Sequence, residues 1–403
     1  MLIYQKKIQN YYSNYMKNNI TNIVKKHLCC SCGLCSAICP KKAIKYEIDK
    51  LGFPIPLVNE NCINCKICIT YCPGGNNLKK TIAISESWLY GFSTDKETRM
   101  NSSSGGILTE LLCALINNNI VEYVSLVTNY EKSNLPRIIL TNNINEIRKY
   151  KTSKYCPVEF GDIINQIKNI NGRIAIVGLP CQINALKEYC KKNKAVSSKI
   201  VYYFSLFCNH VPSYRAIHYL ASNVGVKEWN KVLFRGDGWP GFFRFYKGSE
   251  EVARIPYRKG MYSGVGKYFK NIRCNFCNDP FGTSADASFG DAYFCTQDKF
   301  GSTLIICRSQ MLLSLFKRFN GDLWSINEVE NMDAIRPFYK KMFLRNESTE
   351  VFNFYLSRYY KSYKCNSDIC KSTFISHVKI LKQVFVSHLG RYGLLWKYLY
   401  KIN

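Results

Sequence analysis

Two copies of one four-cysteine spacing near the N-terminus constrain this chain more than any other feature of its sequence. Residues 29–40 contain cysteines separated by gaps of two, two and three residues and end on Pro40, and residues 62–73 repeat this spacing and end on Pro73. Gaps of two residues allow three thiolates of one tight loop to reach three different irons of a cubane cluster. The repeated segment is therefore expected to hold metal.

The spacing is that of the bacterial ferredoxin run for two [4Fe–4S] clusters, in which the fourth thiolate of each cluster comes from the opposite run. A zinc ribbon instead uses ligand pairs that are separated by a longer spacer. Cys30 falls outside the register of both copies and receives no ligand role. The two predicted ligand sets are Cys29, Cys32, Cys35 and Cys72 for one cluster, and Cys62, Cys65, Cys68 and Cys39 for the other.

The sequence also predicts where the chain is located. Its N-terminus has no apolar stretch followed by small residues, and no segment reaches about eighteen apolar residues, so neither a secretory signal nor a transmembrane helix is expected. The 20 cysteines among its 403 residues are then expected in a reducing cytoplasm. Thiols there serve as metal ligands or redox groups more often than as disulfides. The length predicts two or three domains.

Residues 82–330 alternate short β-branched runs with helical patterns, which is typical of a mixed α/β body. We therefore predict an α+β chain, in which a small dicluster domain like a bacterial ferredoxin precedes a larger α/β body. A Ser/Gly run at 101–106 leads into an apolar helical stripe at 107–116. Small residues at a helix start allow a phosphate to approach free N–H groups, although an ordinary helix cap explains this run equally well.

Other cysteines follow expected strands of the body. Residues 173–178 read as a buried strand and residues 182–190 as a helix, which places Cys181 at the carboxyl end of a strand, where open sheets bind ligands. Cys181 is then a candidate nucleophile with His210 as its base, a cluster ligand, or an inert thiol. The pair Cys274 and Cys277 is consistent with half a zinc ribbon, a dithiol or half a cluster. These alternatives stay open on the residues alone.

The order of several short motifs carries a resemblance. Residues 99–309 resemble the family of coenzyme F420 hydrogenase/dehydrogenase beta subunits, in the form with a ferredoxin domain in front. The expected domains are a ferredoxin-type domain at 20–80, the N-terminal and C-terminal family regions at 81–160 and 161–330, and a basic, aromatic helical extension at 331–403. The matching motifs are Ser103-Ser104-Gly105-Gly106, Ser153-Lys154-Tyr155, Gly178-Leu179-Pro180-Cys181-Gln182, Phe207-Cys208, Cys274-x2-Cys277, Ala285-Asp286 and Gly290-Asp291.

The resemblance implies an iron–sulfur flavoprotein oxidoreductase. Members of the family bind FAD and one further [4Fe–4S] cluster in the body and exchange electrons with coenzyme F420. The body would thus pass electrons between a one-electron carrier and a hydride carrier such as F420. A Cys181 thiolate on iron is not free to act as a nucleophile. The implied cluster ligands are Cys181, Cys208, Cys274 and Cys277, and the implied FAD contacts are Ser103, Ser104, Gly105, Gly106, Lys154 and Tyr155.

Two other functions remain open under this resemblance. Family copies with a fused ferredoxin domain also occur in bacterial surface-polysaccharide gene clusters, so the hydride partner is not named by the fold. The first alternative is a reductase that acts on a sugar or a lipid-linked precursor. The second is a non-catalytic electron-transfer subunit of a larger complex.

The net charge of +28 predicts an anionic partner. Residues 1–80 carry 12 lysines and 3 acidic residues, which would steer an acidic ferredoxin or flavodoxin to that end. Residues 371–403 carry six Lys or Arg and no acidic residue, beside many aromatics. This tail either packs on the body, which we favour, or contacts the inner face of a membrane. Nucleic acid is disfavoured because no recognised motif accompanies the charge.

Overall fold

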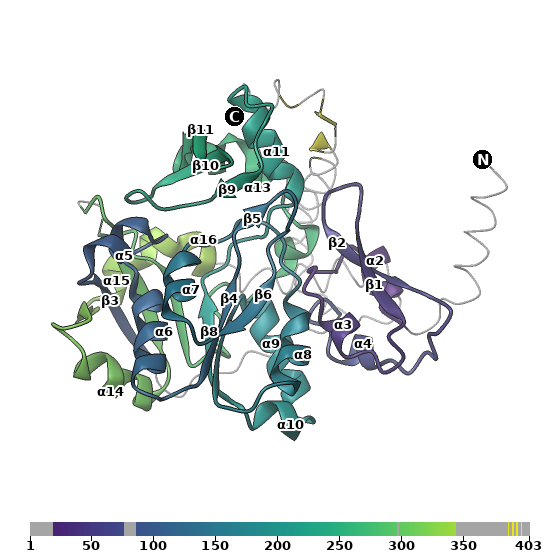
Figure 1. The fold of residues 1–403 in the computed structure, drawn as a ribbon, viewed down its shortest axis with the longest axis horizontal. Helices are drawn as coiled ribbons and strands as arrows, with labels where there is room; N and C mark the ends of the chain where they lie inside the picture. Colours follow the sequence, from purple (N-terminus) through teal and green to yellow (C-terminus); the bar gives the residue numbers. More distant parts are fainter. Residues whose placement is uncertain are drawn as a thin grey trace, which may run out of the picture.

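The computed structural model describes residues 19–75, 86–295 and 298–343, together with six positions between 386 and 396. Most of the expected C-terminal extension, including nearly all of the basic tail, lies outside these residues. In the described part of the chain, no helix combines the length and the apolar character needed to cross a bilayer. Figure 1 shows the cysteine-rich segment (residues 19–75) beside a larger body.

The cysteine-rich segment repeats one local structure twice. In each copy a short helix starts just after the second cysteine, at a residue with positive φ: Gly33 with φ 78° and Lys66 with φ 65°. The strands β1 and β2 pair antiparallel between the two helices. The sequence duplication is therefore also a duplication of backbone conformation. The elements are α2 (Thr21–Lys25), α3 (Leu34–Ala37), β1 (Ile44–Ile48), β2 (Pro54–Val58) and α4 (Ile67–Thr70).

The body is built on an eight-stranded mixed sheet with the order β14-β3-β13-β12-β8-β7-β4-β6. The central strands β12, β8, β7 and β4 run parallel, and the remaining pairs are antiparallel. This agrees with the expected mixed α/β body. The strands are β3 (Ser87–Ser93), β4 (Tyr123–Val127), β6 (Ile138–Thr141), β7 (Ile174–Gly178), β8 (Ile200–Leu206), β12 (Ala287–Asp291), β13 (Thr303–Cys307) and β14 (Trp324–Glu328).

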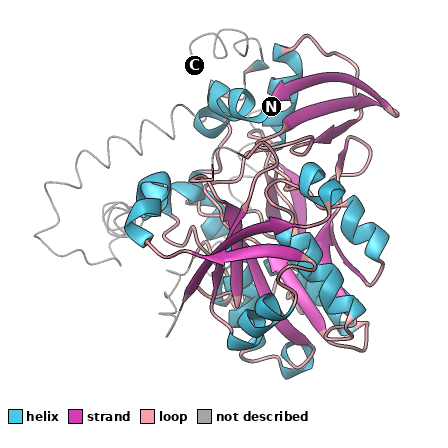
Figure 2. Ribbon diagram, turned by 90° about the vertical axis from the view of Figure 1, so that its left-hand side faces the viewer, coloured by secondary structure: helices cyan, strands magenta, loops and turns pink. Residues whose placement is uncertain are grey.

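Helices cover both faces of this sheet (Figure 2), because the buried strands have apolar side chains on both sides. In β7, Ala175 and Val177 pack in one core with α6 and α14, whereas Ile174 and Ile176 pack in another core with α8 and α9. The expected helix after β7 forms, but it starts at Pro180, because proline is favoured in a first helical turn. The helices include α5 (Lys96–Asn101), α6 (Ile107–Asn117), α7 (Ile144–Lys149), α8 (Ile163–Lys168), α9 (Pro180–Cys190), α10 (Lys194–Ser197) and α14 (Gln310–Arg318).

A smaller antiparallel sheet with the order β11-β10-β9-β5 and a further apolar core complete the body. Trp396 belongs to this core and packs against Tyr219 and Phe269. This described part of the C-terminal tail therefore contacts the body. The elements are β5 (Tyr130–Glu131), β9 (Lys231–Leu233), β10 (Phe242–Lys247), β11 (Glu250–Pro256), α11 (Tyr214–Asn223), α12 (Tyr257–Gly260), η2 (Met261–Val265), α13 (Gly266–Tyr268), η3 (Ile272–Phe276), α15 (Met332–Ile335), η4 (Arg336–Tyr339) and α16 (Lys340–Phe343).

The cysteine-rich segment docks on the body through a close backbone contact. The N–H of Gly161, in the 3-10 helix η1 (Phe160–Asp162), donates to the carbonyl of Cys32 at 2.8 Å. A Cβ on Gly161 would lie 2.3 Å from the carbonyl carbon and oxygen of Gly33. Leu34 and Ile38 also enter the apolar core of α8 and α9. The first cysteine run is thus packed into the body, beside the helices α8 and α9 in Figure 1.

This contact predicts that Gly161→Ala destabilises the docked segment. A new Cβ would overlap backbone atoms that have no flexible end to move aside, so we expect a loss of about 1–3 kcal/mol. A lower apparent melting temperature and faster protease cleavage within residues 19–75 would report it. Gly393→Ala is the control, because its Cβ meets nothing within 4 Å. An unchanged melting temperature for Gly161→Ala would contradict the close approach.

Candidate functional site

Four cysteines of the segment surround one small hollow at its surface, here called the outer site. They are Cys39, Cys62, Cys65 and Cys68. Burial raises the pKa of the Cys68 thiol, and the nearby thiols of Cys62, Cys65 and Cys39 raise it further. The N–H of Ala43 points at the sulfur of Cys39 at 3.3 Å. Cys65 is exposed. The crossed ligand set expected from the sequence is thus brought together here.

A second group of four thiols, the inner site, lies beneath the docked surface. Its members are Cys29, Cys32, Cys35 and Cys72. Burial raises the pKa of Cys29 well above its ordinary value, and Cys30, Cys72 and Cys35 raise it further. Burial likewise raises the pKa of Cys72 to about 12. The Tyr46 hydroxyl lies 3.1 Å from the sulfur of Cys35, and the N–H of Ser31 donates to the sulfur of Cys29 at 3.4 Å.

The four-cysteine spacing of each run in the sequence favours a cluster over a single zinc ion. Zinc bound to four thiolates brings the sulfurs within about 4 Å of one another, since each Zn–S bond is about 2.3 Å. In a cubane each thiolate binds a different iron, so the sulfurs stay farther apart. Among the described residues, no group of three or more His, Cys, Asp or Glu side chains is arranged to hold one metal ion. Both sites nevertheless gather four thiols and N–H groups that point at sulfur.

A third group of thiols lies in the body and is called the body site. Cys181 lies in the first turn of the helix α9 after β7, Cys208 follows β8, and Cys277 follows the short helix η3. Hydrogen bonding to Cys30 raises the pKa of Cys181, and burial and the thiols of Cys208 and Cys277 raise it further. Cys274 lies within η3, one turn before Cys277. The structure thus brings Cys181, Cys208 and Cys277 together, and it adds Cys30, which the sequence register left without a role.

A cavity of about 560 Å³ opens beside the body site, at the carboxyl ends of β8 and β12 and at the start of α6. Cys208 and His210 line it. A neighbouring cavity of about 160 Å³ is lined by Cys30 and Cys181 and shares several lining residues with the larger one, including Lys154. Asp291 is the one carboxylate among the described residues that line the large cavity. The cationic side chains that line it are Lys151, Lys154, Arg235, Arg258, Lys270 and Lys341.

Arg235 organises one wall of the large cavity, a role that no sequence motif had indicated. It is 1% exposed and pairs with Asp291 through both guanidinium NH2 groups, at 2.9 and 3.3 Å. It also donates to the Tyr155 hydroxyl at 3.0 Å and to the Ser103 carbonyl. Three motifs that are distant in sequence therefore meet at one buried guanidinium. The sequence feature that could have indicated Arg235 is the glycine-rich loop that begins with it, residues 235–241, shortly after β9.

The Ser/Gly run has both a structural and a lining role. The Ser103 hydroxyl accepts from the N–H of Ser153, and the Ser104 hydroxyl donates to the carbonyl of Ser302 at 2.9 Å. Gly105 packs against backbone, because a Cβ there would lie 2.5 Å from the carbonyl oxygen of Gly91. Gly106 caps α6 with φ 83°. Both serines and Gly106 line the cavity, whereas Gly105 does not.

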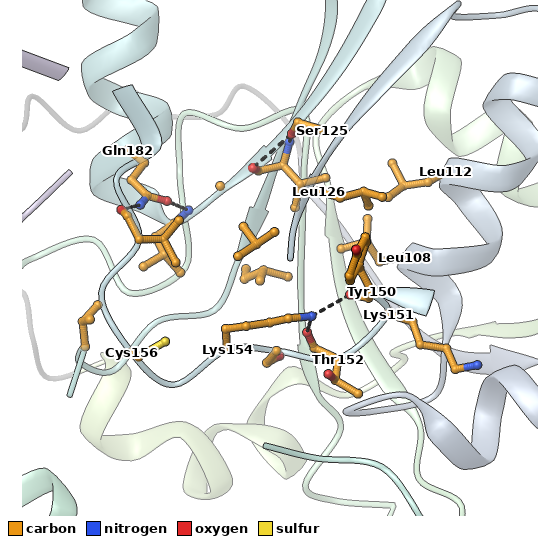
Figure 3. A pocket seen from close by; sticks show the side chains of 18 of the residues that line it. Leu108, Leu112, Ser125, Leu126, Tyr150, Lys151, Thr152, Lys154, Cys156 and Gln182 are labelled. Carbon is orange, nitrogen blue, oxygen red and sulfur yellow. Dashed lines mark hydrogen bonds between the residues drawn. The ribbon is translucent and has the colours of Figure 1, made fainter. Parts of the chain in front are cut away.

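Lys154 lines both cavities. Its ammonium donates to the carbonyls of Thr152 and Tyr150 at 2.5 and 2.7 Å, as Figure 3 shows. Burial lowers the pKa of Lys154 to about 7, and Cys156 opposes this shift. Lys154 is therefore charged below about pH 7 and neutral above it. Such a group is able to hold an anion or exchange a proton near neutral pH.

Two buried polar atoms in this wall have no hydrogen-bond partner within the described part of the protein. They are the Ser102 hydroxyl oxygen and the Nε of Arg235. Buried polar groups are normally hydrogen-bonded, so such atoms call for an explanation. Together with the cationic lining, they suit a bound anion. A flavin nucleotide, with a pyrophosphate and a flat ring, is compatible with a cavity of this size that Tyr257 and Tyr293 also line.

Two long regions of the body match one known family. Residues 88–165 match the N-terminal region of the coenzyme F420 hydrogenase/dehydrogenase beta subunit, and residues 171–331 match its C-terminal region. Together these matches cover more than half of the chain. They include the Ser/Gly run, Lys154 and Arg235, and the cysteines Cys181, Cys208, Cys274 and Cys277.

Several proteins share part of this sequence. A component of the F420H2 dehydrogenase of Methanosarcina mazei is 25% identical over 287 residues, or 68% of this chain and 78% of that protein. A coenzyme F420-dependent sulfite reductase of Methanocaldococcus jannaschii is 23% identical over 361 residues, 83% of this chain. The match spans 53%, about half, of that reductase. An uncharacterized ferredoxin of the same organism is 35% identical over 60 residues, 15% of this chain and 78% of the ferredoxin.

One solved structure has a similar fold. A chain of the xenon-derivatised F420-reducing [NiFe] hydrogenase complex from Methanosarcina barkeri superposes with a TM-score of 0.52. It is 17% identical, and the match covers 66% of this chain and 91% of that chain. Because the two sequences are only 17% identical, the comparison shows a similar fold and no more.

The buried pair of Arg235 and Asp291 generates a stability prediction. Arg235→Met leaves the nearly buried Asp291 carboxylate with the Trp239 and Tyr293 side chains as its remaining donors among the described residues, so we expect a loss of about 3–5 kcal/mol. Arg235→Lys should recover only part of this loss, because lysine lacks the bidentate fork. Denaturant unfolding measures both. The double variant Arg235→Met/Asp291→Asn should lose less than the single variants combined, and strict additivity would contradict the pairing.

Proposed function

Because the chain belongs to the family of coenzyme F420 hydrogenase/dehydrogenase beta subunits, we propose that it is an iron–sulfur flavoprotein oxidoreductase. It moves electrons between a one-electron carrier and a hydride carrier such as F420, through [4Fe–4S] clusters and FAD. One observation carries the proposal: three groups of thiols follow one another from the exposed edge of the cysteine-rich segment to a cation-lined cavity in the body.

The order of the thiol groups supports a continuous path. The outer site includes the exposed Cys65. It adjoins the inner site. Burial is the largest cause that raises the pKa of Cys35, and the thiols of Cys72 and then Cys68 raise it further, so Cys68 must lie close to Cys35. The inner site adjoins the body site through Cys30, which is hydrogen-bonded to both Cys32 and Cys181. Cys208 of the body site lines the large cavity. An electron that enters at Cys65 thus reaches the cavity through neighbouring sites.

The thiol groups fit three clusters. Cys29, Cys32, Cys35 and Cys72 would hold the inner cluster, and Cys39, Cys62, Cys65 and Cys68 the outer one. Cys181, Cys208, Cys274 and Cys277 would hold the cluster of the body. The clusters accept and release single electrons, while a flavin exchanges one or two electrons and passes a hydride.

The residues of the large cavity would bind an anionic cofactor, orient it and neutralise its charge. Six cationic side chains line the large cavity and would face an anionic cofactor, and two buried polar atoms without a partner among the described residues lie in its wall. Arg235 is fixed by Asp291 and cannot swing away, so its free Nε keeps one direction. Lys154, with its pKa near neutral, is positioned to hold a phosphate or a polar ring edge and to exchange a proton. Ser102, Ser103 and Gly106 form the adjoining wall at the start of α6.

The face around the outer site suits an acidic electron carrier such as a ferredoxin or flavodoxin. Ile63 is 59% exposed at the rim of the hollow, and Lys41 and Lys66 lie exposed beside it. An exposed apolar residue ringed by like charges is a common form of transient interface. The ligand Cys65 lies on the same face, so a docked carrier would be close to the outer cluster.

The cluster assignment predicts an iron content. Anaerobically purified protein should contain about twelve irons and as many sulfides per chain. Cys68→Ala should lose about four irons, because it removes a ligand of the outer cluster alone. Cys113→Ala should keep about twelve, because Cys113 is a buried core residue outside the three sites. Iron and sulfide analysis measures this. Four or fewer irons in the unaltered chain, with zinc in their place, would contradict the proposal.

A turnover assay tests which molecule accepts the hydride. Reduced ferredoxin is supplied as donor under anaerobic conditions, and F420 or a nucleotide sugar is supplied as acceptor. We expect F420 absorbance to bleach, more slowly at high salt because the docking face is basic. Reduction of the sugar alone would replace this proposal with the polysaccharide-precursor reductase. Turnover that appears only with an added partner protein would identify a non-catalytic electron-transfer subunit.

A further inference from the structure

The junction between the inner site and the body site holds two residues that are not ligands of either proposed cluster. Cys30 is the first. Its thiol lies within hydrogen-bonding reach of Cys32, an inner-site thiol, and of Cys181, a body-site thiol. It also lines the smaller cavity together with Cys181. Cys30 is therefore in contact with one thiol of each site at the same time.

Arg273 is the second residue. It is 6% exposed, and its guanidinium donates to the carbonyl of Pro73, next to Cys72, at 3.1 Å. It also directly precedes Cys274 in η3. Asn271 fixes this arrangement, because its side chain accepts from the Arg273 N–H at 2.9 Å and donates to the carbonyl of Cys29 at 3.2 Å. A buried positive charge thus lies where the two sites meet.

We propose that Cys30 and Arg273 form the electron-transfer bridge between the inner cluster and the cluster of the body. This inference rests on the proposed function, because it assigns residues toward the clusters proposed there. One electron passes from the inner cluster, which is oxidised, to the body cluster, which is reduced, and no bond or proton is exchanged. Cys30 fills the space between the two ligand spheres. Arg273 and Cys30 act on the clusters through charge and hydrogen bonding and are positioning residues.

The electrostatic effect of Arg273 on a nearby cluster has a definite sign. A cluster gains negative charge on reduction, so a nearby positive charge and hydrogen bonds to its sulfurs raise its reduction potential. Burial strengthens the charge effect, because few water molecules screen it. Loss of the Arg273 charge should therefore make the reduction potential of the adjoining inner cluster more negative, whereas loss of the Cys30 side chain should slow transfer between the two clusters. The outer cluster, which neither residue contacts, should keep its potential.

The test is a redox titration followed by low-temperature EPR on the full, cluster-loaded chain. Arg273→Met should shift the inner-cluster potential to more negative values, and Arg273→Lys should leave it near the original value because the charge stays. Cys30→Ala should slow the arrival of electrons at the body cluster in rapid-freeze experiments. Arg99→Met, which removes a mostly buried arginine paired with Asp298, is the matched control and should shift none.

The outcomes separate this inference from the proposed function. A chain that binds no clusters fails the proposed function itself. A chain with full iron content, in which Arg273→Met and Cys30→Ala leave all potentials and the transfer rate unchanged, overturns only the bridge. Equal shifts for Arg273→Lys and Arg273→Met would overturn the charge role of Arg273. Cys30→Ala removes only one small group, so the test stays decisive even if Arg273→Met releases the docked segment.

Discussion

The close backbone contact between Gly33 and Gly161 decides how the two parts of this protein can work together. The lack of side chains at both positions lets the first cysteine run approach the body until Gly161 donates directly to the carbonyl of Cys32. That approach brings Cys30 to Cys181 and the carbonyls of Cys29 and Pro73 to Asn271 and Arg273. A Cβ at Gly161 would overlap the Gly33 carbonyl at 2.3 Å, and a Cβ at Gly33 would lie 3.1 Å from the Gly161 nitrogen, so Gly161 is the stricter requirement. The second run has Lys66 at the position equivalent to Gly33, and both Lys66 and the neighbouring Cys65 are exposed.

Charge is the second organising feature. The chain carries +28, and six cationic side chains line the large cavity. Each [4Fe–4S] core with four thiolates carries about −2, and the pyrophosphate of FAD about −2 more, so the proposed cofactors would lower the total to roughly +20. With these cofactors bound, part of the apparent excess would compensate internal anions. Arg235 illustrates this, because Asp291 satisfies one side of its guanidinium and leaves Nε for another acceptor.

Local features of the sequence predicted much of this arrangement. The cysteine spacing predicted both crossed groups of thiols, because the spacing itself reflects the loop that wraps a cluster. The apolar run before Cys181 predicted its place at the end of a strand, and the Ser/Gly run predicted the start of α6. Arg235 and Asp291 could not be paired in advance, since 56 residues separate them and Arg235 follows a strand of the small sheet while Asp291 lies in the large one. The contacts of Cys30 likewise depend on docking, which no local pattern encodes.

The central claim is that three neighbouring clusters connect the surface to the cavity. Low-temperature EPR of the anaerobically reduced chain tests it most directly, because each reduced [4Fe–4S] cluster contributes one spin and neighbouring clusters broaden one another's signals. The account predicts about three spins per chain, with signs of interaction between them. A chain that shows no such signal and contains zinc, or one whose spins are isolated from one another, would contradict it.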